Sequence, residues 1–230
     1  MRAIGLFFLL FLPFLPCDAA GKKERRAPVA SVITSSPAAP TIVIDAGHGG
    51  TDRGAKAHMP YCEEKKLCLQ TARLVKQYLE QLGYHVIMTR TTDSFIPLPR
   101  RVEIANLSSS NIFVSVHFNS SKVPTAQGVE VFFFDSKEEK TRAVSSKKLA
   151  EAVLGRVIRR TSANSRGVKK GNFYVIRETH MPAILVEGGF LTNPEERSLL
   201  KSREYQEKIA RGIADGVDYY FKARWRSRKA

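Results

Sequence analysis

The stretch Thr41-Ile-Val-Ile-Asp-Ala-Gly-His48-Gly-Gly50 joins a run of branched apolar residues to a glycine-rich turn that contains a histidine. Two later stretches have the same form: Asn111-Ile-Phe-Val-Ser-Val-His117 and Pro182-Ala-Ile-Leu-Val-Glu187. Short apolar runs bounded by Gly and Pro are typical of buried strands in an α/β sheet. Ligands of such sheets bind beyond the carboxyl ends of the strands. Two histidines and a glutamate placed there predict one metal-dependent active site.

The rest of the chain alternates between helical and strand-like segments. Helices are expected over residues 62–82, 97–107, 141–160 and 194–221, and further strands over 84–90 and 128–134, the latter at or near an edge. A Gly- and Asn-rich turn leads into the short apolar run 173–176. We therefore expect an α/β fold: a single-domain sandwich with a mostly parallel, twisted central sheet flanked by helices. Cys62 and Cys68 both fall on the first helix and on different faces, so no disulfide is expected between them.

The residue types fit a hydrolytic zinc site, which commonly uses three protein ligands and leaves one position for water. His48 and His117 are two candidate ligands. Glu63 and Glu64 are candidates for the third, although acidic residues at a helix N-terminus also simply favour the helix dipole. Glu64 is the better ligand, because its helical face is the more apolar and should point inward. Glu187 ends the most apolar run, where burial would raise its pKa, as suits a general base.

These motifs, taken together and in order, carry a resemblance to a known family. The matching segments are 45–54, 64–70, 89–90, 98–101 with 105–106, 115–119 and 183–193. They resemble the zinc-dependent N-acetylmuramoyl-L-alanine amidases of the Amidase_3 group, the AmiA/AmiB/AmiC type. The resemblance implies that His48, Glu64 and His117 bind one zinc ion and that Glu187 is catalytic. Asn119 is a candidate substrate-binding residue within the same motif.

By the same resemblance, the reaction cuts the amide bond between N-acetylmuramic acid and L-alanine of the stem peptide, in peptidoglycan or a lipid-linked precursor. This reaction serves cell-wall remodelling and division. The periplasmic cell-division members carry an additional helix, after the strand that corresponds to 128–134, which blocks the zinc until an activator displaces it. Here only residues 135–140 separate that strand from the next helix. The sequence therefore predicts an enzyme that needs no activator.

Composition and the N-terminal residues indicate the partners and the compartment of the protein. The 230 residues are 43% hydrophobic and carry a formal net charge of +15, which favours an anionic partner. We expect no nucleic acid among its partners, because no motif of a nucleic-acid-binding class is recognisable. Residues 1–19 are typical of a secretory signal, which predicts a periplasmic protein. Residues 20–40 are expected to be a linker, 41–222 the catalytic domain and 223–230 a basic tail. Cys17 is a poorer candidate for a lipid anchor, because a proline precedes it.

Three other interpretations remain open at this point. A zinc peptidase with another substrate would use the same metal chemistry. Ser145 and Lys148 fit the Ser-x-x-Lys pattern of penicillin-sensitive D,D-carboxypeptidases, but Ser198 and Lys201 fit it equally well in this Ser- and Lys-rich chain. A basic protein that only binds the wall would leave the two histidines and Glu187 without a role.

Overall fold

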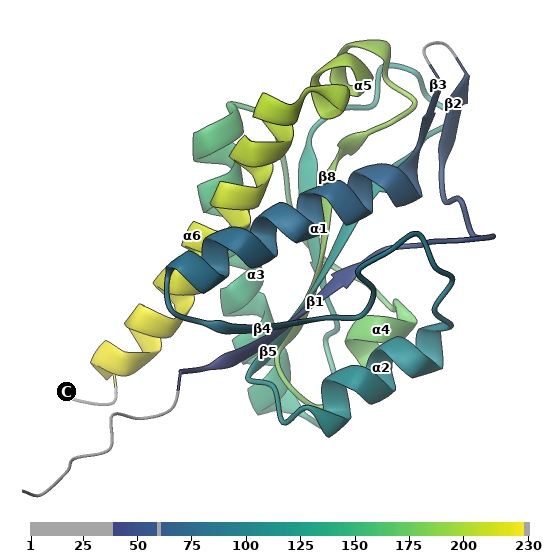
Figure 1. The fold of residues 1–230 in the computed structure, drawn as a ribbon. Coiled ribbons are helices and arrows are strands. Elements are labelled where there is room, and N and C mark those ends of the chain that lie inside the picture. Colours follow the sequence, from purple (N-terminus) through teal and green to yellow (C-terminus); the bar gives the residue numbers. More distant parts are fainter. Residues whose placement is uncertain (1–38, 59–60, 228–230) are drawn as a thin grey trace, which may run out of the picture. The chain divides into compact units, whose positions relative to one another are not determined.

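The described part of the chain, residues 39–58 and 61–227 of a computed structural model, is built around one six-stranded sheet (Figure 1). Its strands are β1 (Thr41–Ala46), β4 (His85–Met88), β5 (Ile112–Asn119), β6 (Val129–Phe133), β7 (Ser165–Lys170) and β8 (Ala183–Phe190). Their order across the sheet is β4-β1-β5-β8-β6-β7. Every neighbouring pair is parallel except β8 with β6. The predicted α/β fold with a mostly parallel sheet is therefore confirmed, with β6 and β7 reversed.

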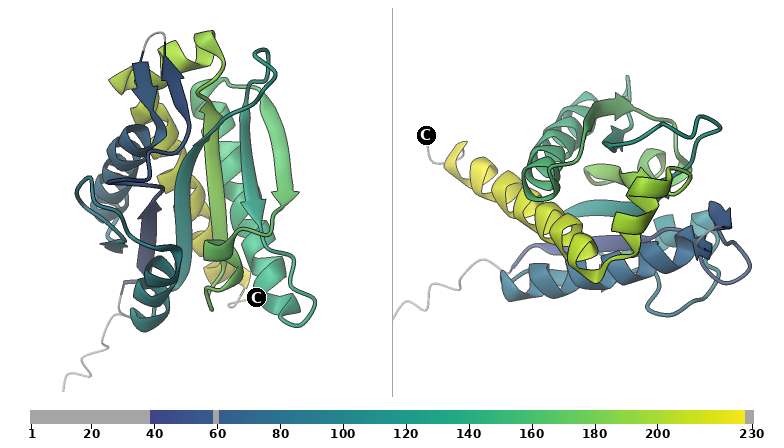
Figure 2. Two further views of the ribbon diagram at one scale, coloured as in Figure 1. Left: turned by 90° about the vertical axis from the view of Figure 1, so that its right-hand side faces the viewer. Right: turned by 90° about the horizontal axis from the view of Figure 1, so that it is seen from above.

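Helices cover both faces of the sheet, but unequally. They are α1 (Glu64–Gln81), α2 (Leu98–Leu107), α3 (Lys140–Thr161), α4 (Tyr174–Arg177), α5 (Pro194–Lys201) and α6 (Arg203–Ser227). Helices α1, α3 and α6 enclose the larger hydrophobic core on one face, and α6 runs between α3 and α1 (Figure 2). Helices α2 and α4 cover a smaller core on the other face. The thinner layer leaves room for a site at one end of the strands.

The side-chain alternation of β5 shows where that site lies. Ile112, Val114 and Val116 point into the larger core. Phe113, Ser115 and His117 point to the opposite face, that of α2 and α4. On that face the strand is apolar at its amino end and polar at its carboxyl end. Polar chemistry is thus confined to the carboxyl edge of the α2/α4 face.

Two details at the first helix differ from the expectation. Helix α1 begins at Glu64, not at Cys62, because residues before it form a small antiparallel hairpin of β2 (Lys56–His58) and β3 (Tyr61–Glu63). Cys62 therefore lies on β3 and Cys68 on α1, and both are free and buried. The expected absence of a disulfide between them holds, although the reason given for it, a shared helix, was wrong.

The second half of the chain also departs from the expectation in places. Strand β6 lies between β8 and β7, so it is next to an edge of the sheet, the second of the two expected positions. The edge strand beside it, β7, was not predicted, because its sequence Ser-Arg-Gly-Val-Lys-Lys lacks an apolar alternation. The apolar run 173–176 forms most of the short helix α4. Helix α6 continues to Ser227, through residues expected in the basic tail. The expected signal, most of the linker, Cys17 and the last three residues lie outside the described residues.

Candidate metal centre

Three side chains meet at the carboxyl edge of the sheet: His48, Glu64 and His117. Their ligand atoms all lie within 4.8 Å of one another. Both His48 Nε2, at 3.0 Å, and His117 Nδ1, at 2.9 Å, approach the same carboxylate oxygen, Glu64 Oε1. The histidine side chains remain 23% and 17% exposed, so the cluster is accessible from solvent. The structure thus brings together the three ligands expected from the sequence.

Glycines allow this close approach. A Cβ atom at Gly47 would lie 2.3 Å from the ring of His117, so only glycine fits where the two loops meet. At Gly54, φ is +64° and a Cβ would lie 2.6 Å from Glu64 Oε2 and 2.7 Å from His48 Cδ2. His48 itself has φ +58°, an uncommon conformation for a residue other than glycine. The turn after β1 therefore has an uncommon backbone conformation, and this conformation brings the His48 ring close to Glu64 and His117.

Two buried arginines hold this turn by its carbonyl groups. Arg101 donates to Ala46 O at 2.6 Å and to His48 O at 2.7 Å. Arg90 donates to Ala46 O at 2.9 Å and to Gly47 O at 2.6 Å. Arg101 also forms a buried ion pair with Asp45, at 2.7 Å. Arg90 and Arg101, which come from the segments 89–90 and 98–101, thus stabilise the backbone of the His48 turn.

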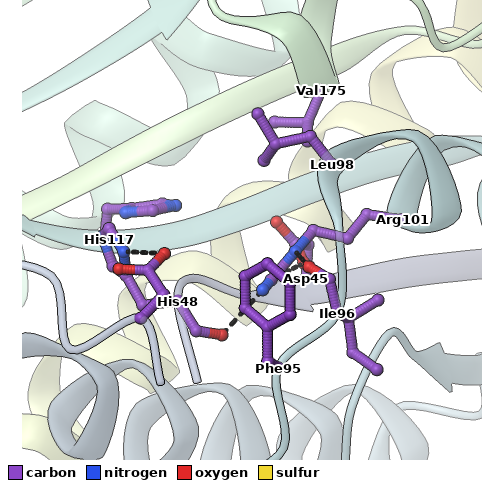
Figure 3. A pocket seen from close by; sticks show the side chains of 9 residues that line it. Asp45, His48, Phe95, Ile96, Leu98, Arg101, His117 and Val175 are labelled. Carbon is purple, nitrogen blue, oxygen red and sulfur yellow. Dashed lines mark hydrogen bonds and ion pairs between the residues drawn. The ribbon is translucent and has the colours of Figure 1, made fainter. Parts of the chain in front are cut away.

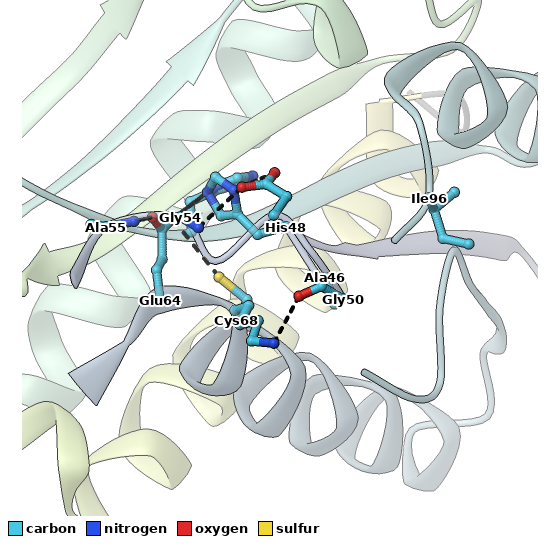
Figure 4. A network of polar contacts seen from close by, with 12 residues as sticks. Ala46, His48, Gly50, Gly54, Ala55, Glu64, Cys68 and Ile96 are labelled. Atoms are coloured by element: carbon cyan, nitrogen blue, oxygen red, sulfur yellow. Dashed lines mark hydrogen bonds and ion pairs between the residues drawn. The ribbon is translucent and has the colours of Figure 1, made fainter. Parts of the chain in front are cut away.

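Glu64 is fixed from all sides (Figure 4). Its Oε2 accepts from Ala55 N at 2.8 Å, and its Oε1 accepts from Phe118 N at 3.2 Å. Cys68 Sγ lies behind it, 3.9 Å from Oε1. Burial alone would raise the pKa of Glu64, but the hydrogen bonds and charges of His117 and His48 lower it strongly. Glu64 is therefore a carboxylate that is ready to bind a cation.

Glu63, the rejected alternative, is equally buried but faces elsewhere. Its Oε1 accepts from Tyr61 Oη at 2.6 Å, and its carboxylate also pairs with Lys66 and Arg53. These contacts stabilise the start of α1. Glu63 thus has a structural role, and Glu64 reaches the histidines.

Asp52 was not among the residues predicted from the sequence, although it lies four positions after His48 in the same loop. Asp52 Oδ2 lies 2.8 Å from His48 Nδ1. Burial alone would lower the pKa of His48, but hydrogen bonds with Glu64 and Asp52 raise it. When Nδ1 donates its proton to Asp52, Nε2 keeps a free electron pair and points to the cluster.

We expect Asp52→Asn to weaken zinc binding by about 10- to 100-fold, because an orienting carboxylate of this kind fixes the ring and raises its basicity. A competition titration against a chelator measures the change. Asp135→Asn is the matched control, since Asp135 pairs on the surface with Lys170, at 2.6 Å. Equal zinc affinity of wild type and Asp52→Asn would contradict the role of Asp52.

Glu187 lies beside the cluster on β8. It is the register partner of His117 on the neighbouring strand, so both side chains point to the α2/α4 face. Its side chain is partly exposed, but its Oε2 is buried and has no hydrogen-bond partner among the described residues. Removal from water, together with the negative charges of Glu64 and Glu130, raises the pKa of Glu187 well above its ordinary range. Such a carboxyl group is suited to receive a proton.

The remaining predicted site residues lie in different places. Asn119, at the end of β5, donates from Nδ2 to Glu130 Oε1 at 2.7 Å, on the same face as Glu187. Ser145 and Lys148 lie on α3, and Lys148 is exposed. Their neighbour Ser146 accepts a hydrogen bond from the backbone of Ala183, at the amino end of β8 and four residues before Glu187.

The serine mechanism of Ser145 and Lys148 remains an untested prediction. Because Lys148 is exposed and makes no hydrogen bond with Ser145 in the described part of the chain, it is not placed to activate that hydroxyl, and we expect a penicillin-type β-lactam to leave the protein unlabelled. Mass spectrometry of the intact protein after incubation measures this. A covalent adduct on Ser145 would restore the alternative.

A cavity of about 240 Å³ opens next to the two histidines (Figure 3). Apolar side chains form one wall of this cavity: Phe95, Ile96, Leu98 and Val175. Phe95 and Leu98 are 52% and 51% exposed, so their apolar surface is accessible to a ligand. The arrangement offers a substrate a polar metal side and an apolar side.

The donor set fits zinc. Two imidazoles and one carboxylate are a common ligand set of catalytic zinc sites, and three protein ligands leave a position for water or substrate. Both histidine nitrogens already face a common point at the Glu64 carboxylate, and Asp52 fixes one ring from behind. His48, Glu64 and His117 are therefore the side chains that would hold the ion.

Comparisons with known proteins agree with this geometry. The family model of the N-acetylmuramoyl-L-alanine amidases, Amidase_3, matches residues 42–219. YqiI of Bacillus subtilis is 36% identical over 79% of this chain and 84% of its own length. The probable cell wall amidase LytH of Staphylococcus epidermidis is 33% identical over 79% of this chain, which spans 58% of LytH.

A solved structure is also similar. The N-acetylmuramoyl-L-alanine amidase of Clostridium difficile 630 is 37% identical and superposes with a TM-score of 0.76, over 80% of this chain and 98% of that one. The match thus covers both the fold and the segments that carry the His48, Glu64 and His117 cluster. The chain belongs to the Amidase_3 family of zinc-dependent N-acetylmuramoyl-L-alanine amidases.

Proposed function

We propose that this protein hydrolyses the amide bond between N-acetylmuramic acid and the L-alanine of the stem peptide in peptidoglycan. The observation that carries the proposal is the carboxyl group of Glu187, with one buried and unpartnered oxygen, beside a His-Glu-His cluster. A binding protein has no need of such a group, because burying a carboxylate without a partner is costly. A hydrolase uses it to move a proton.

The residues divide the reaction between them. Zinc held by His48, Glu64 and His117 would polarise the scissile carbonyl and lower the pKa of a water molecule. Glu187 takes a proton from the water that attacks the carbonyl carbon, and then delivers it to the nitrogen of L-alanine. The carbon–nitrogen bond breaks, the sugar side leaves as a carboxylic acid, and the peptide leaves with a free amine. Asn119 lies on the same face and is our candidate for contacting the substrate.

Mass spectrometry of peptidoglycan fragments tests the proposal. Incubation with the purified protein and zinc should release free stem peptides with an intact L-alanine, and a chelator should stop the release. Cleavage within the peptide instead would indicate the rival zinc peptidase. Loss of only a terminal D-alanine, indifferent to chelation, would favour the serine mechanism.

We further propose that the enzyme needs no activator. Strand β6 ends at Phe133 and α3 begins at Lys140, so only six residues, 134–139, connect them and no helix is inserted there. We expect the purified protein alone to cleave peptidoglycan in the assay above. An enzyme that stays inert with zinc until a partner protein is added would contradict this.

The substrate sets where the enzyme acts. A cell-wall amidase works outside the cytoplasm, and we propose that this one is exported to the periplasm by the signal-like residues 1–19. Retention through a lipid on Cys17 is the less favoured route. Among residues 39–58 and 61–227, no helix has the length and apolar character to cross a membrane.

A further inference from the structure

The edge strand β7 contains an irregularity directly opposite Glu130. Val129 pairs with Ser165 and Val131 pairs with Val168, so Glu130 alone faces two residues, Arg166 and Gly167. Gly167 has φ +87°, which permits the extra residue. This is a β-bulge, and bulges commonly redirect a side chain next to an active site.

The bulge places two cations on one side of the sheet. In a regular strand, residues three positions apart point to opposite faces. Here Arg166 Nε, at 2.9 Å, and Lys169 Nζ, at 2.5 Å, both reach Glu130 Oε2. Lys169 pairs in register with Phe132, which belongs to the α2/α4 face. The cation pair therefore lies on the same face as Glu187.

Glu130 holds Arg166 and Lys169 in place, but its single negative charge offsets only one of their two positive charges. Its side chain is only 5% exposed, while those of Arg166 and Lys169 are 37% and 38% exposed. Its other oxygen, Oε1, accepts from Asn119. Two cations on one carboxylate leave one positive charge in excess. Among the described residues Lys169 Nζ donates only to Glu130, whereas an ammonium group can donate three hydrogen bonds.

The position of the pair relative to the scissile bond can be read from the sheet. Glu130 is the register partner of Glu187 on the neighbouring strand, about 5 Å away at ordinary strand spacing. An extended peptide covers about 7 Å in two residues. The strand order places the cation pair on one side of Glu187, and the cavity beside His48 and His117 on the other.

We propose that Arg166 and Lys169 form an anion-binding subsite that receives the carboxylate of the residue after L-alanine in the stem peptide. The uncharged sugar, with its methyl groups, then lies toward the apolar cavity. The subsite rests on the proposed amidase function and makes the enzyme selective for the charge of its substrate. Arg166 and Lys169 are thus specificity-determining residues that take no part in bond cleavage.

Two synthetic substrates test the subsite. Both are N-acetylmuramoyl-L-alanine extended by one glutamate whose side-chain carboxyl group is amidated, so that the two differ only at the α-carboxyl group. The glutamate α-carboxylate is free in the first substrate and is a carboxamide in the second. Because a hydrogen bond to a charged group contributes enough for about a 10- to 100-fold effect, wild-type kcat/KM should favour the free carboxylate by about tenfold or more. The readout is the ratio of the two kcat/KM values, which a general loss of structure does not change.

Variants test whether Arg166 and Lys169 cause the preference for the free carboxylate. Arg166→Gln and Lys169→Gln should bring the ratio close to one, and Lys169→Arg should keep most of the preference. Arg203→Gln should leave it unchanged, because Arg203 forms an exposed ion pair with Glu207 on α6, on the other face of the sheet. A variant that slows both substrates by the same factor would overturn the subsite, because its effect would then be structural.

The outcomes also separate the two proposals. Wild-type hydrolysis of both substrates at equal rates would overturn the subsite and leave the amidase function standing. Hydrolysis of neither substrate would overturn both.

Discussion

Replacing Glu187 by Gln is expected to lower kcat/KM for peptidoglycan fragments by about 10²- to 10⁴-fold, the usual contribution of a positioned acid–base group. Glutamine keeps the shape of the side chain but cannot accept the proton. Because His48, Glu64 and His117 are unchanged, the variant should bind one zinc ion like the wild type. Steady-state kinetics and the zinc content of the purified protein measure the two quantities.

The control must remove a carboxylate from the same face without touching the cluster. Glu178, at the end of α4, is exposed and pairs with Arg177 at 2.6 Å. Glu178→Gln should therefore keep full activity. If Glu187→Gln keeps its activity as well, the proton acceptor is a different group and the proposed mechanism fails.

Asp45→Asn is expected to lower the free energy of unfolding by about 3 to 5 kcal/mol, because it breaks a buried ion pair and leaves a charged partner behind. Asp45 and Arg101 are 1% and 2% exposed, and their atoms approach to 2.7 Å. Asp45 also accepts from Thr89 at 2.6 Å and from Ser115 at 2.7 Å. Urea denaturation of the metal-free protein measures the change without a contribution from zinc.

The difference in unfolding free energy between wild type and Asp45→Asn should change with pH. Burial alone would raise the pKa of Asp45, but Arg101 and the hydrogen bonds from Thr89 and Ser115 lower it below the ordinary value. A carboxyl group of this kind stabilises the fold above its ordinary pKa of about 3.9, and the contribution is lost as the pH falls toward the folded-state pKa. The gap between wild type and Asp45→Asn should therefore narrow in acid.

An exposed pair on the same helix supplies the control. Arg100 and Glu103 lie on α2 and are about half exposed, at 55% and 51%. Exposed pairs contribute about 1 kcal/mol or less. Glu103→Gln should thus change stability by no more than that. A similar loss for Asp45→Asn and Glu103→Gln would show that the buried pair has no special role in holding the His48 turn.

The sequence is informative where one property determines both structure and chemistry. Strands β1, β5 and β8 contain apolar runs, so they must be buried, and each run is followed by a polar residue of the site: His48, His117 or Glu187. The two histidines and Glu187 could therefore be placed at one edge of the sheet from the order of residues alone. Glu64 could be chosen over Glu63 from the apolar face that it shares with Leu67 and Cys68, although Glu63 lies on β3 and not on the helix as expected.

The features that could not be predicted depend on pairing between distant segments. Nothing in the sequence of β7 distinguishes an edge strand from a polar loop, because its side chains pack against little. Glu130 gave one signal, a lone carboxylate within the apolar run Val129–Phe133, but its partners are 36 and 39 positions away along the chain. The run 173–176 is too short for its periodicity to separate helix from strand.

The bulge in β7 has a consequence for solubility. An outer strand offers a row of unpaired backbone groups to which a strand of another molecule can add. Here one outer strand, β4, has only four residues, and the other, β7, is bent by its bulge and carries Arg166, Lys169 and Lys170. Short length, irregular backbone and repelling cations all oppose such addition. Replacing these cations to alter substrate choice would therefore also weaken the protection of this edge against aggregation.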